Sequence, residues 1–125
     1  PSGVKTFRWY VTSLGRVMLA HLPPAELDAY FAKVKLKPMT DKTETNQKRL
    51  RELLVQVRQD GYAINDEELE LGLRSIAVPV RGASGQVLAA LNVGAQASRV
   101  SEERMRQEFL PILQRGAQEL SVLLP

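Results

Sequence analysis

The hydrophobic pattern of this chain changes its period halfway along, and this change limits the folds that the chain can adopt. Before residue 61, apolar residues recur every three or four positions, as they do in helices that bury one face. Between residues 74 and 94 they alternate in steps of two, which is the spacing of β-strands. Helices followed by paired strands and a further helix predict an α+β domain, with an antiparallel sheet flanked by helices.

The first half of the sequence predicts three helices. The first covers about residues 13–21, the second begins at Pro23-Pro24, and the third covers about residues 44–60. Between the second and third, the basic segment from Lys33 to Lys42 predicts an exposed loop. A weak alternation before the first helix predicts a short strand, carried by Phe7, Trp9 and Val11.

Residues 74–80 and 86–94 predict the two strands of a β-hairpin, because the glycine-containing segment between them is typical of a turn. A four-residue loop would pair Arg81 with Gln86 and place Ser75 opposite Asn92. One face of the hairpin then carries large aliphatic side chains. The other face carries mostly small or polar ones: Ser75, Ala77, Pro79, Leu88, Ala90, Asn92 and Gly94.

This face of small residues has two interpretations. Small side chains leave space, and a few polar groups directed into such a space are typical of a small-molecule pocket. Alternatively, helices pack closely against the small face while Ser75 and Asn92 bond to each other. The spacing of the residues fits both arrangements equally well.

The stretch TSLGRVML, residues 12–19, is the second candidate for binding chemistry. Thr12 or Ser13 is a typical N-cap, and the first turn of a helix presents unpaired N–H groups and the positive end of the helix dipole. Such an end can hold a carboxylate or phosphate, and Gly15 would let the ligand approach the backbone closely. An ordinary capped helix that binds nothing explains the same residues.

The last predicted helix begins near Ser101, a serine cap flanked by Val100 and Met105 as a hydrophobic staple. We expect a kink at Pro111, because proline lacks the N–H group that the interior of a helix requires. The expected buried face consists of Met105, Phe109, Ile112, Gly116 and Leu120.

Length and composition limit the class of protein. The chain has 125 residues, no cysteine and a formal net charge of +3, which fits one domain without disulfides or thiol chemistry. No apolar run approaches the ~20 residues of a membrane span, and we expect a cytoplasmic protein with no membrane contact. Because the chain starts at Pro1 without an initiator methionine, we expect it to be a fragment of something longer.

The sequence predicts no enzyme, no metal site and no direct DNA contact by this chain. The only histidine, His21, lies at the end of a helix, where a packing or surface role is commoner than catalysis. The carboxylates between Asp66 and Glu70 are typical of a solvated turn, and no Cys/His ligand set is present. The basic residues have little aromatic interleaving and are typical of a solvated face: Lys33, Lys35, Lys37, Lys42, Lys48, Arg49 and Arg51.

Three segments together resemble a known family. TSLGRVMLA, the block GYAINDEELELGLRSIAVPVRGASGQVLAALNV and the serine-capped last helix are similar to the effector-binding domain of IclR-type bacterial transcription regulators. The likeness covers about residues 10–124. ELELGLRSIAVPV with AALNV looks most similar to the branch that regulates β-ketoadipate-pathway genes, whose members respond to aromatic acids or their ring-opened products.

The resemblance implies a GAF-like domain over residues 1–125 whose opening strands are truncated, since only about eleven residues precede TSLGR. It further implies a homodimer or homotetramer, and no cofactor. Contact with DNA would be made only through an N-terminal winged helix-turn-helix domain that is absent from this chain.

The resemblance also implies a ligand site. Backbone amides at the start of the first helix would hold the ligand's carboxylate, and side chains from the second half would contact the rest. Founding members carry an acid where Asn65 stands, cysteine in place of Ser75, and serines in place of Asn92 and Gly94, so their small keto-acid ligands are not carried over. The seven matched positions are Ser13, Leu14, Gly15, Asn65, Ser75, Asn92 and Gly94.

These observations predict a ligand-sensing domain that binds a small carboxylate, either an aromatic acid or a ring-cleavage product. Binding of this effector would control attachment to DNA allosterically. The alternative is a dimerisation or oligomerisation module that uses the same helices and hairpin and leaves the small face filled.

Overall fold

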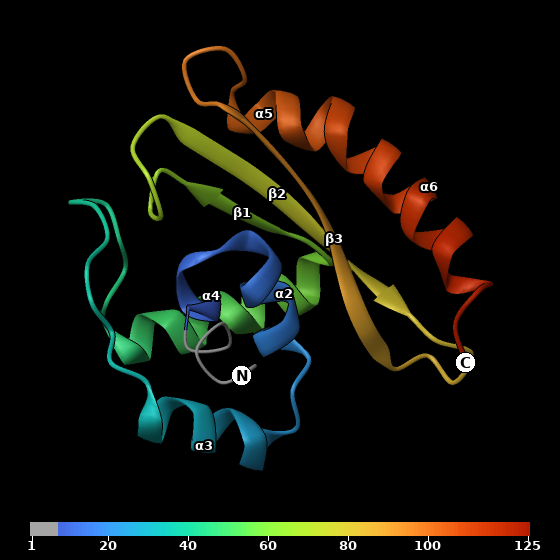
Figure 1. The fold of residues 1–125 in the computed structure, drawn as a ribbon, viewed down its shortest axis with the longest axis horizontal. Helices are drawn as coiled ribbons and strands as arrows, with labels where there is room; N and C mark the ends of the chain where they lie inside the picture. Colours follow the sequence, from blue (N-terminus) through green and yellow to red (C-terminus); the bar gives the residue numbers. More distant parts are fainter. Residues whose placement is uncertain (1–7) are drawn as a thin grey trace.

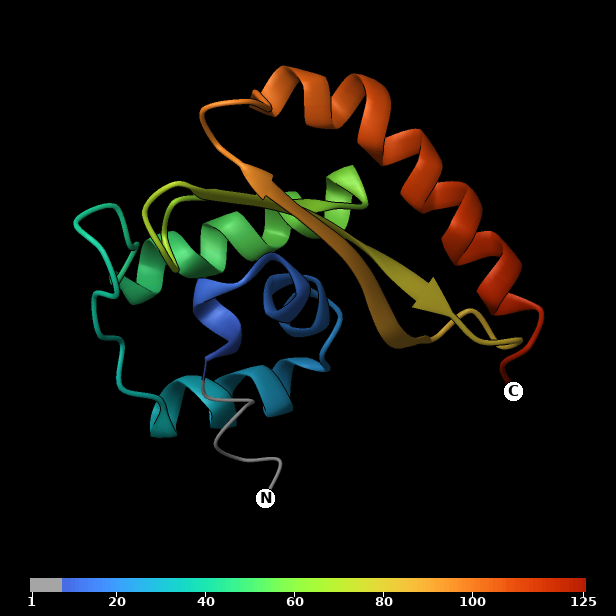
Figure 2. The same ribbon diagram turned by 45° about the horizontal axis from the view of Figure 1, so that its top comes forward.

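The computed structural model describes residues 8–125, in which a three-stranded antiparallel sheet separates two groups of helices (Figure 1). The predicted α+β class and antiparallel sheet are confirmed. Figure 2 shows the long C-terminal helix on one side of the sheet and the earlier helices on the other. The elements are η1 (Trp9–Val11), α2 (Ser13–Ala20), α3 (Pro24–Lys33), α4 (Gln47–Asp60), β1 (Ala63–Asp66), β2 (Leu73–Arg81), β3 (Val87–Gln96), α5 (Glu102–Arg104), η2 (Met105–Phe109) and α6 (Leu110–Ser121).

The helices begin where the sequence places capping residues. The Thr12 hydroxyl accepts a hydrogen bond from the Gly15 amide at 2.9 Å and so caps α2. Asn46 caps α4 and Ser101 caps α5 in the same way. α4 ends at Gly61, whose φ of 80° lies in the left-handed region that glycine adopts without strain.

The two faces of the sheet differ in side-chain size, as the alternation predicts. The large face packs against η2 and α6, in a core cluster built from Ile76, Val78, Val80, Met105, Leu113 and Ala117. The small face packs against η1 and the helices α2, α3 and α4. Its sheet residues in that second cluster are Ala63, Ala77 and Ala90.

The predicted register of the hairpin is wrong by two residues. Five residues, and not four, separate the paired Arg81 and Val87, and a β-bulge follows at once, because Val80 pairs with Ala89. Ser75 therefore lies opposite Gly94 instead of Asn92. Because side chains alternate with a period of two, a shift of two residues leaves every side chain on the predicted face.

The strand predicted around Trp9 and Val11 is wrong, and Phe7 lies outside the described residues. Trp9–Val11 form a turn of 3₁₀-helix, in which the Val11 amide donates to the Arg8 carbonyl at 3.1 Å. Tyr10 and Val11 are both buried in the helical core, so neighbouring side chains point inward and no two-residue alternation is possible.

The predicted buried face of the last helix holds for Met105 and Phe109 and is wrong at Ile112 and Leu120. Residues 105–109 form a π-helical turn in which the Leu110 amide donates to the Met105 carbonyl, one residue farther than in an α-helix. The extra residue moves the buried stripe to Leu113 and Ala117 and leaves Ile112 60% exposed. The irregularity lies just before Pro111, where a proline would otherwise clash with the preceding turn.

Gly15 gives a test of the packing between η1 and α2. A Cβ atom at this position would lie 2.2 Å from Cα of Trp9, so no side chain fits there. Gly15→Ala is expected to lower the free energy of unfolding by about 1–3 kcal/mol, against the usual preference of helices for alanine. The matched control is Gly94→Ala, whose Cβ would meet its nearest neighbour at an ordinary 3.4 Å. Equal stabilities of the two variants in urea denaturation would contradict this packing.

His21 predicts a dependence of stability on pH. It caps the C-terminal end of α2, and its buried Nε2 has no hydrogen-bond partner within the described part of the chain. Burial, with Arg81 and Arg58 nearby, lowers the pKa of His21 below its ordinary value of 6.5. The unfolded chain therefore binds this proton more readily than the folded one.

Stability is expected to fall as the pH drops below about 6.5, and to fall less in His21→Gln, which cannot take up the proton. Urea unfolding of both proteins at pH 7 and pH 5 measures the difference. Identical losses of stability in the two proteins would show that His21 is not responsible.

Candidate functional site

Three of the predicted ligand contacts form a row across the sheet. Ser75 in the central strand β2 lies opposite Asn65 of β1 on one side and opposite Gly94 of β3 on the other. Residues paired in this way have side chains on the same face, so the row lies on the small face of the sheet. The corrected register thus brings these residues together more closely than the predicted one did.

The start of α2 lies directly against this row. The Ser13 hydroxyl is 2.8 Å from the Ser75 hydroxyl, and either oxygen can be the donor. Ser13 is only 1% exposed, whereas Ser75 is partly exposed. The hydroxyl pair joins the first turn of the helix to the middle of the sheet, which is the place that the sequence predicts for the site.

The backbone amides in the first turn of α2 differ in whether they have an acceptor among residues 8–125. The Gly15 amide donates to the Thr12 hydroxyl and the Arg16 amide to the Thr12 carbonyl. The amides of Ser13 and Leu14 donate to no acceptor among residues 8–125. The predicted set of three amides is therefore reduced to two here, because the helix's own cap occupies the third.

The structure shows that packing requires a glycine at residue 15. The sequence suggests that this glycine lets a ligand approach the backbone, but its open side is filled by Trp9 of η1. Close packing between η1 and α2 is the reason that no side chain is tolerated at residue 15.

Asn65 is buried and makes one hydrogen bond from each end of its side-chain amide. Its Nδ2 donates to the carbonyl of Val11 at 2.5 Å, and its Oδ1 accepts from the amide of Glu68 at 3.1 Å. With 3% of its surface exposed, it joins β1 to the segment that precedes α2. The second N–H of Nδ2 and the second lone pair of Oδ1 have no partner recorded among residues 8–125.

The two predicted contacts on β3 lie in the open. Asn92 and Gly94 are both exposed. Asn92 pairs with Ala77 and lies two residues along β3 from Gly94, on the same face of the sheet. Gly94 borders a cavity of about 520 Å³ at the far end of the hairpin. The other residues that line this cavity are Glu70, Leu71, Gly72, Leu73, Ala95, Gln96 and Ser98.

An ion pair that the sequence did not suggest lies beside the site. Arg16 donates from its two terminal nitrogens to the two carboxylate oxygens of Glu68, at 2.8 and 2.7 Å, and from Nε to the Tyr10 carbonyl at 2.8 Å. Arg16 is 3% exposed. Its place among the buried residues of α2 is the only local signal that this arginine is not a surface residue.

The expectation of a solvated acidic turn is wrong for three of its carboxylates. Besides Glu68, Asp66 pairs with Arg74 at 2.9 Å and Glu67 with Lys42 at 2.6 Å. The hydrogen bond from Lys42 lowers the pKa of Glu67, and the Gly72 amide lowers it further. Glu67 also has a φ of 58°, an uncommon backbone conformation for a residue with a side chain.

Much of the basic region is neutralised by neighbouring acids. Lys42 pairs with Glu67 and Arg49 with Glu44, while Arg51 pairs with Asp28. Ion pairs of this kind use the charges that phosphate contacts would need.

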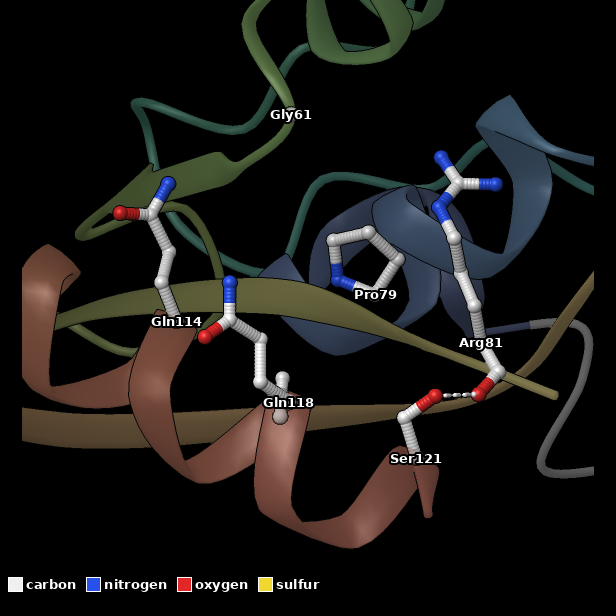
Figure 3. A pocket seen from close by; sticks show the side chains of 7 residues that line it. Gly61, Pro79, Arg81, Gln114, Gln118 and Ser121 are labelled. Carbon is white, nitrogen blue, oxygen red and sulfur yellow. Dashed lines mark hydrogen bonds between the residues drawn. The ribbon is translucent and has the colours of Figure 1, made fainter. Parts of the chain in front are cut away.

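A second cavity, of about 480 Å³, lies between the end of β2 and α6 (Figure 3). It contains none of the seven predicted site residues. Ser121 donates there to the Arg81 carbonyl, which attaches the end of α6 to the strand. The lining consists of Gly61, Pro79, Arg81, Gln114, Ala117, Gln118 and Ser121.

Residues 8–125 offer neither a metal site nor a membrane-spanning helix. The described residues contain no group of three or more His, Cys, Asp or Glu side chains placed to hold a metal ion. None of the described helices is both long and apolar enough to cross a membrane.

Comparison with known proteins identifies the family of this chain. Residues 4–122 match the family model described as bacterial transcriptional regulator IclR C-terminal. The chain is 45% identical over 111 residues to the Pca regulon regulatory protein of Pseudomonas putida, covering 89% of this chain and 38% of that protein. It is 39% identical over 112 residues to the HTH-type transcriptional regulator KdgR of Escherichia coli, covering 90% of this chain and 42% of that protein.

A solved structure shows the same fold with a ligand. The inducer-binding domain of the PobR transcription factor from Acinetobacter, crystallised as a double mutant with 3-hydroxybenzoic acid, superposes with a TM-score of 0.89 at 38% identity. The match covers 93% of this chain and 66% of that one.

The relatives are transcriptional regulators and not enzymes, in agreement with the sequence-based expectation. The chain spans less than half the length of these two curated relatives. Because the family model matches nearly the whole chain, this chain belongs to the IclR C-terminal family, the effector-binding domains of bacterial transcriptional regulators.

Proposed function

We propose that this chain senses a small carboxylate, which binds between the start of α2 and the small face of the sheet. The observation that carries the proposal is the helix start itself. The amides of Ser13 and Leu14 have no acceptor in the described part of the chain, and they lie beside a row of small and polar residues. Partial positive charge at a helix start favours an anion there, and the two N–H groups match the two oxygens of a carboxylate.

The remaining groups of the site suit an aromatic acid with a polar substituent. The hydroxyls of Ser13 and Ser75 can each donate or accept, and the amides of Asn65 and Asn92 can do both. The bound 3-hydroxybenzoic acid in the PobR inducer-binding domain supports this class of ligand. An aromatic acid or its ring-cleavage product is therefore the effector that we propose.

Binding would act on DNA only through other parts of the full-length regulator. We infer a separate DNA-binding domain there, because the matched relatives are more than twice as long and one is named an HTH-type regulator. The effector shifts the equilibrium between two states of the regulator by its difference in affinity for them. Such a regulator acts in the bacterial cytoplasm, where the DNA is.

The carboxylate requirement is tested by calorimetric titration with 3-hydroxybenzoate and with its methyl ester. A charge-assisted hydrogen bond contributes about 1.5–3 kcal/mol, so the ester is expected to bind about ten- to a hundredfold more weakly than the acid. Acid and ester binding with equal affinity would contradict an anion site at the helix start.

The position of the site is tested in the same titration with Ser75→Ala, which removes one hydroxyl from the row. Loss of a neutral hydrogen bond is expected to weaken binding about two- to tenfold. Ser98→Ala is the matched control, because Ser98 is an exposed serine that lies outside the row. Loss of affinity in the control but not in Ser75→Ala would place the ligand elsewhere.

Self-association is a second candidate function, and one observation favours it. α6 and the residues after it expose large apolar side chains, with Ile112 60% and Leu123 79% exposed. Exposed apolar surface of this kind marks interaction sites. We propose a homodimer or homotetramer formed in part through this helix, a function compatible with ligand sensing.

Sedimentation equilibrium tests this second proposal. The wild type is expected to self-associate at micromolar concentration, and Ile112→Glu to shift it towards monomer, because a buried unpaired carboxylate is costly. Glu119→Gln on the same helix is the control and should change nothing. A strictly monomeric wild type at high micromolar concentration would contradict the proposal.

A further inference from the structure

Residues 34–46, which we call the strap, connect α3 to α4 without regular secondary structure (Figure 1). The strap is not a free loop, because hydrogen bonds attach it to the acidic turn, residues 66–72. The hydroxyl of Thr40 donates to the carbonyl of Glu67 at 2.7 Å, and that of Thr43 to the carbonyl of Glu68 at 2.5 Å. Both bonds join segments about 25 residues apart in the chain.

Glu68 is the residue at which the strap, the helix start and the proposed site meet. Its Oε1 accepts from the Glu44 amide of the strap at 2.9 Å and from Arg16 of α2 at 2.7 Å. Its backbone amide donates to Oδ1 of Asn65 in the row at 3.1 Å. A movement of this single residue changes contacts in all three places.

Arg16 ties the same carboxylate to the segment before α2. All three nitrogens of its guanidinium are used, two on Glu68 and one on the Tyr10 carbonyl. The Tyr10 hydroxyl in turn donates to the Lys37 carbonyl at 2.7 Å and accepts from the Lys37 amide at 2.9 Å. Arg16 thus contacts Tyr10 and Glu68, two of the residues that hold the strap, whereas Glu67 holds it separately.

We infer that Arg16 and Glu68 are positioning residues of the effector site, and that their ion pair couples the site to the strap. This inference rests on the proposed function. A ligand that bonds to Asn65 contacts a side chain that is already held by the Val11 carbonyl and the Glu68 amide, so a shift of Asn65 on binding is passed to Glu68. Any resulting shift of Glu68 moves the carboxylate that holds both Arg16 and the Glu44 amide.

The pair also determines the geometry that the ligand meets. A bidentate arginine–carboxylate pair fixes direction as well as distance, so it holds the start of α2 against β1 in one orientation. Sites in which supporting side chains fix the contacting groups bind more tightly than loosely held ones. The strap is linked to the site through Glu68, so we expect the strap to be ordered when the site is correctly formed.

The test compares Glu68→Gln with Asp66→Asn. Both variants remove one charge from the acidic turn. The Asp66 carboxylate, however, accepts from Arg74 and, among the described residues, from no group of α2 or the strap. Two quantities are measured: affinity for 3-hydroxybenzoate by calorimetry, and amide hydrogen exchange at Glu44 and Lys37 by NMR, with and without this ligand.

We expect 3-hydroxybenzoate to change exchange at Glu44 and Lys37 in the wild type. Glu68→Gln should accelerate exchange at Glu44 about tenfold without ligand and weaken binding about three- to thirtyfold, the range seen for residues that modulate coupling without touching a ligand. Asp66→Asn should stay within about twofold of the wild type in both measurements.

The double variant Arg16→Gln/Glu68→Gln distinguishes a positioning role of the ion pair from a role in stability alone. Removing both charges leaves no unpaired buried ion, so the melting temperature should recover relative to Glu68→Gln. Affinity should stay low, because the bidentate geometry is still missing. Affinity that recovers together with the melting temperature would overturn the inference.

The two levels of the proposal fail in different ways. A wild type that does not bind 3-hydroxybenzoate would contradict the proposed aromatic-acid site. The coupling alone would be contradicted if the wild type binds 3-hydroxybenzoate but Glu68→Gln and Asp66→Asn do not differ. The two variants would then have equal affinity for this acid and equal amide exchange at Glu44.

Discussion

The unequal size of the side chains on the two faces of β2 determines the rest of the structure. Branched residues on one face fill the space under α6, while Ser75 and Ala77 on the other let the first helix approach closely. At this separation the hydroxyl of Ser13 reaches that of Ser75, 2.8 Å away. A larger side chain at either β2 position would hold the helix away from the sheet and separate the two halves of the site.

Most of the fold follows from local patterns that can be read one segment at a time. Caps at Thr12 and Ser101 and the glycine after α4 place the helix ends, because each acts on its own first or last turn. The assignment of faces survived a wrong register because the turn and the bulge each added one residue. Together they shift the pairing by two residues, and side chains two residues apart in a strand lie on the same face.

The patterns failed where tertiary packing overrides the local period. η1 buries consecutive residues, Tyr10 and Val11, in the helical core, and three residues are too few for a reliable alternation. The π turn before Pro111 adds one residue to a helix that the sequence treats as regular. From that point every later position is rotated by about 100°, which is why Leu113 and not Ile112 is buried.

In the candidate site too, local features could be predicted from the sequence and long-range contacts could not. The capped helix start and the small face were visible in the sequence, and the resemblance joined them at Ser13 and Ser75. The pair of Arg16 and Glu68 was not visible, because an ion pair between residues 52 positions apart leaves no periodic signal. The packing reason for a glycine at residue 15 was not visible either, because Trp9, which fills the space beside it, comes from the preceding 3₁₀ turn.

The location of the ligand is the claim on which the functional interpretation depends. An NMR titration of the ¹⁵N-labelled chain with 3-hydroxybenzoate locates it directly, because amide shifts change most beside a bound aromatic ring. If the acid binds at the helix start, the largest changes will fall on the amides of Ser13, Leu14 and Gly94. Largest changes at Gly61 and Gln118 instead, which line the cavity under α6, would contradict a carboxylate site between α2 and the small face.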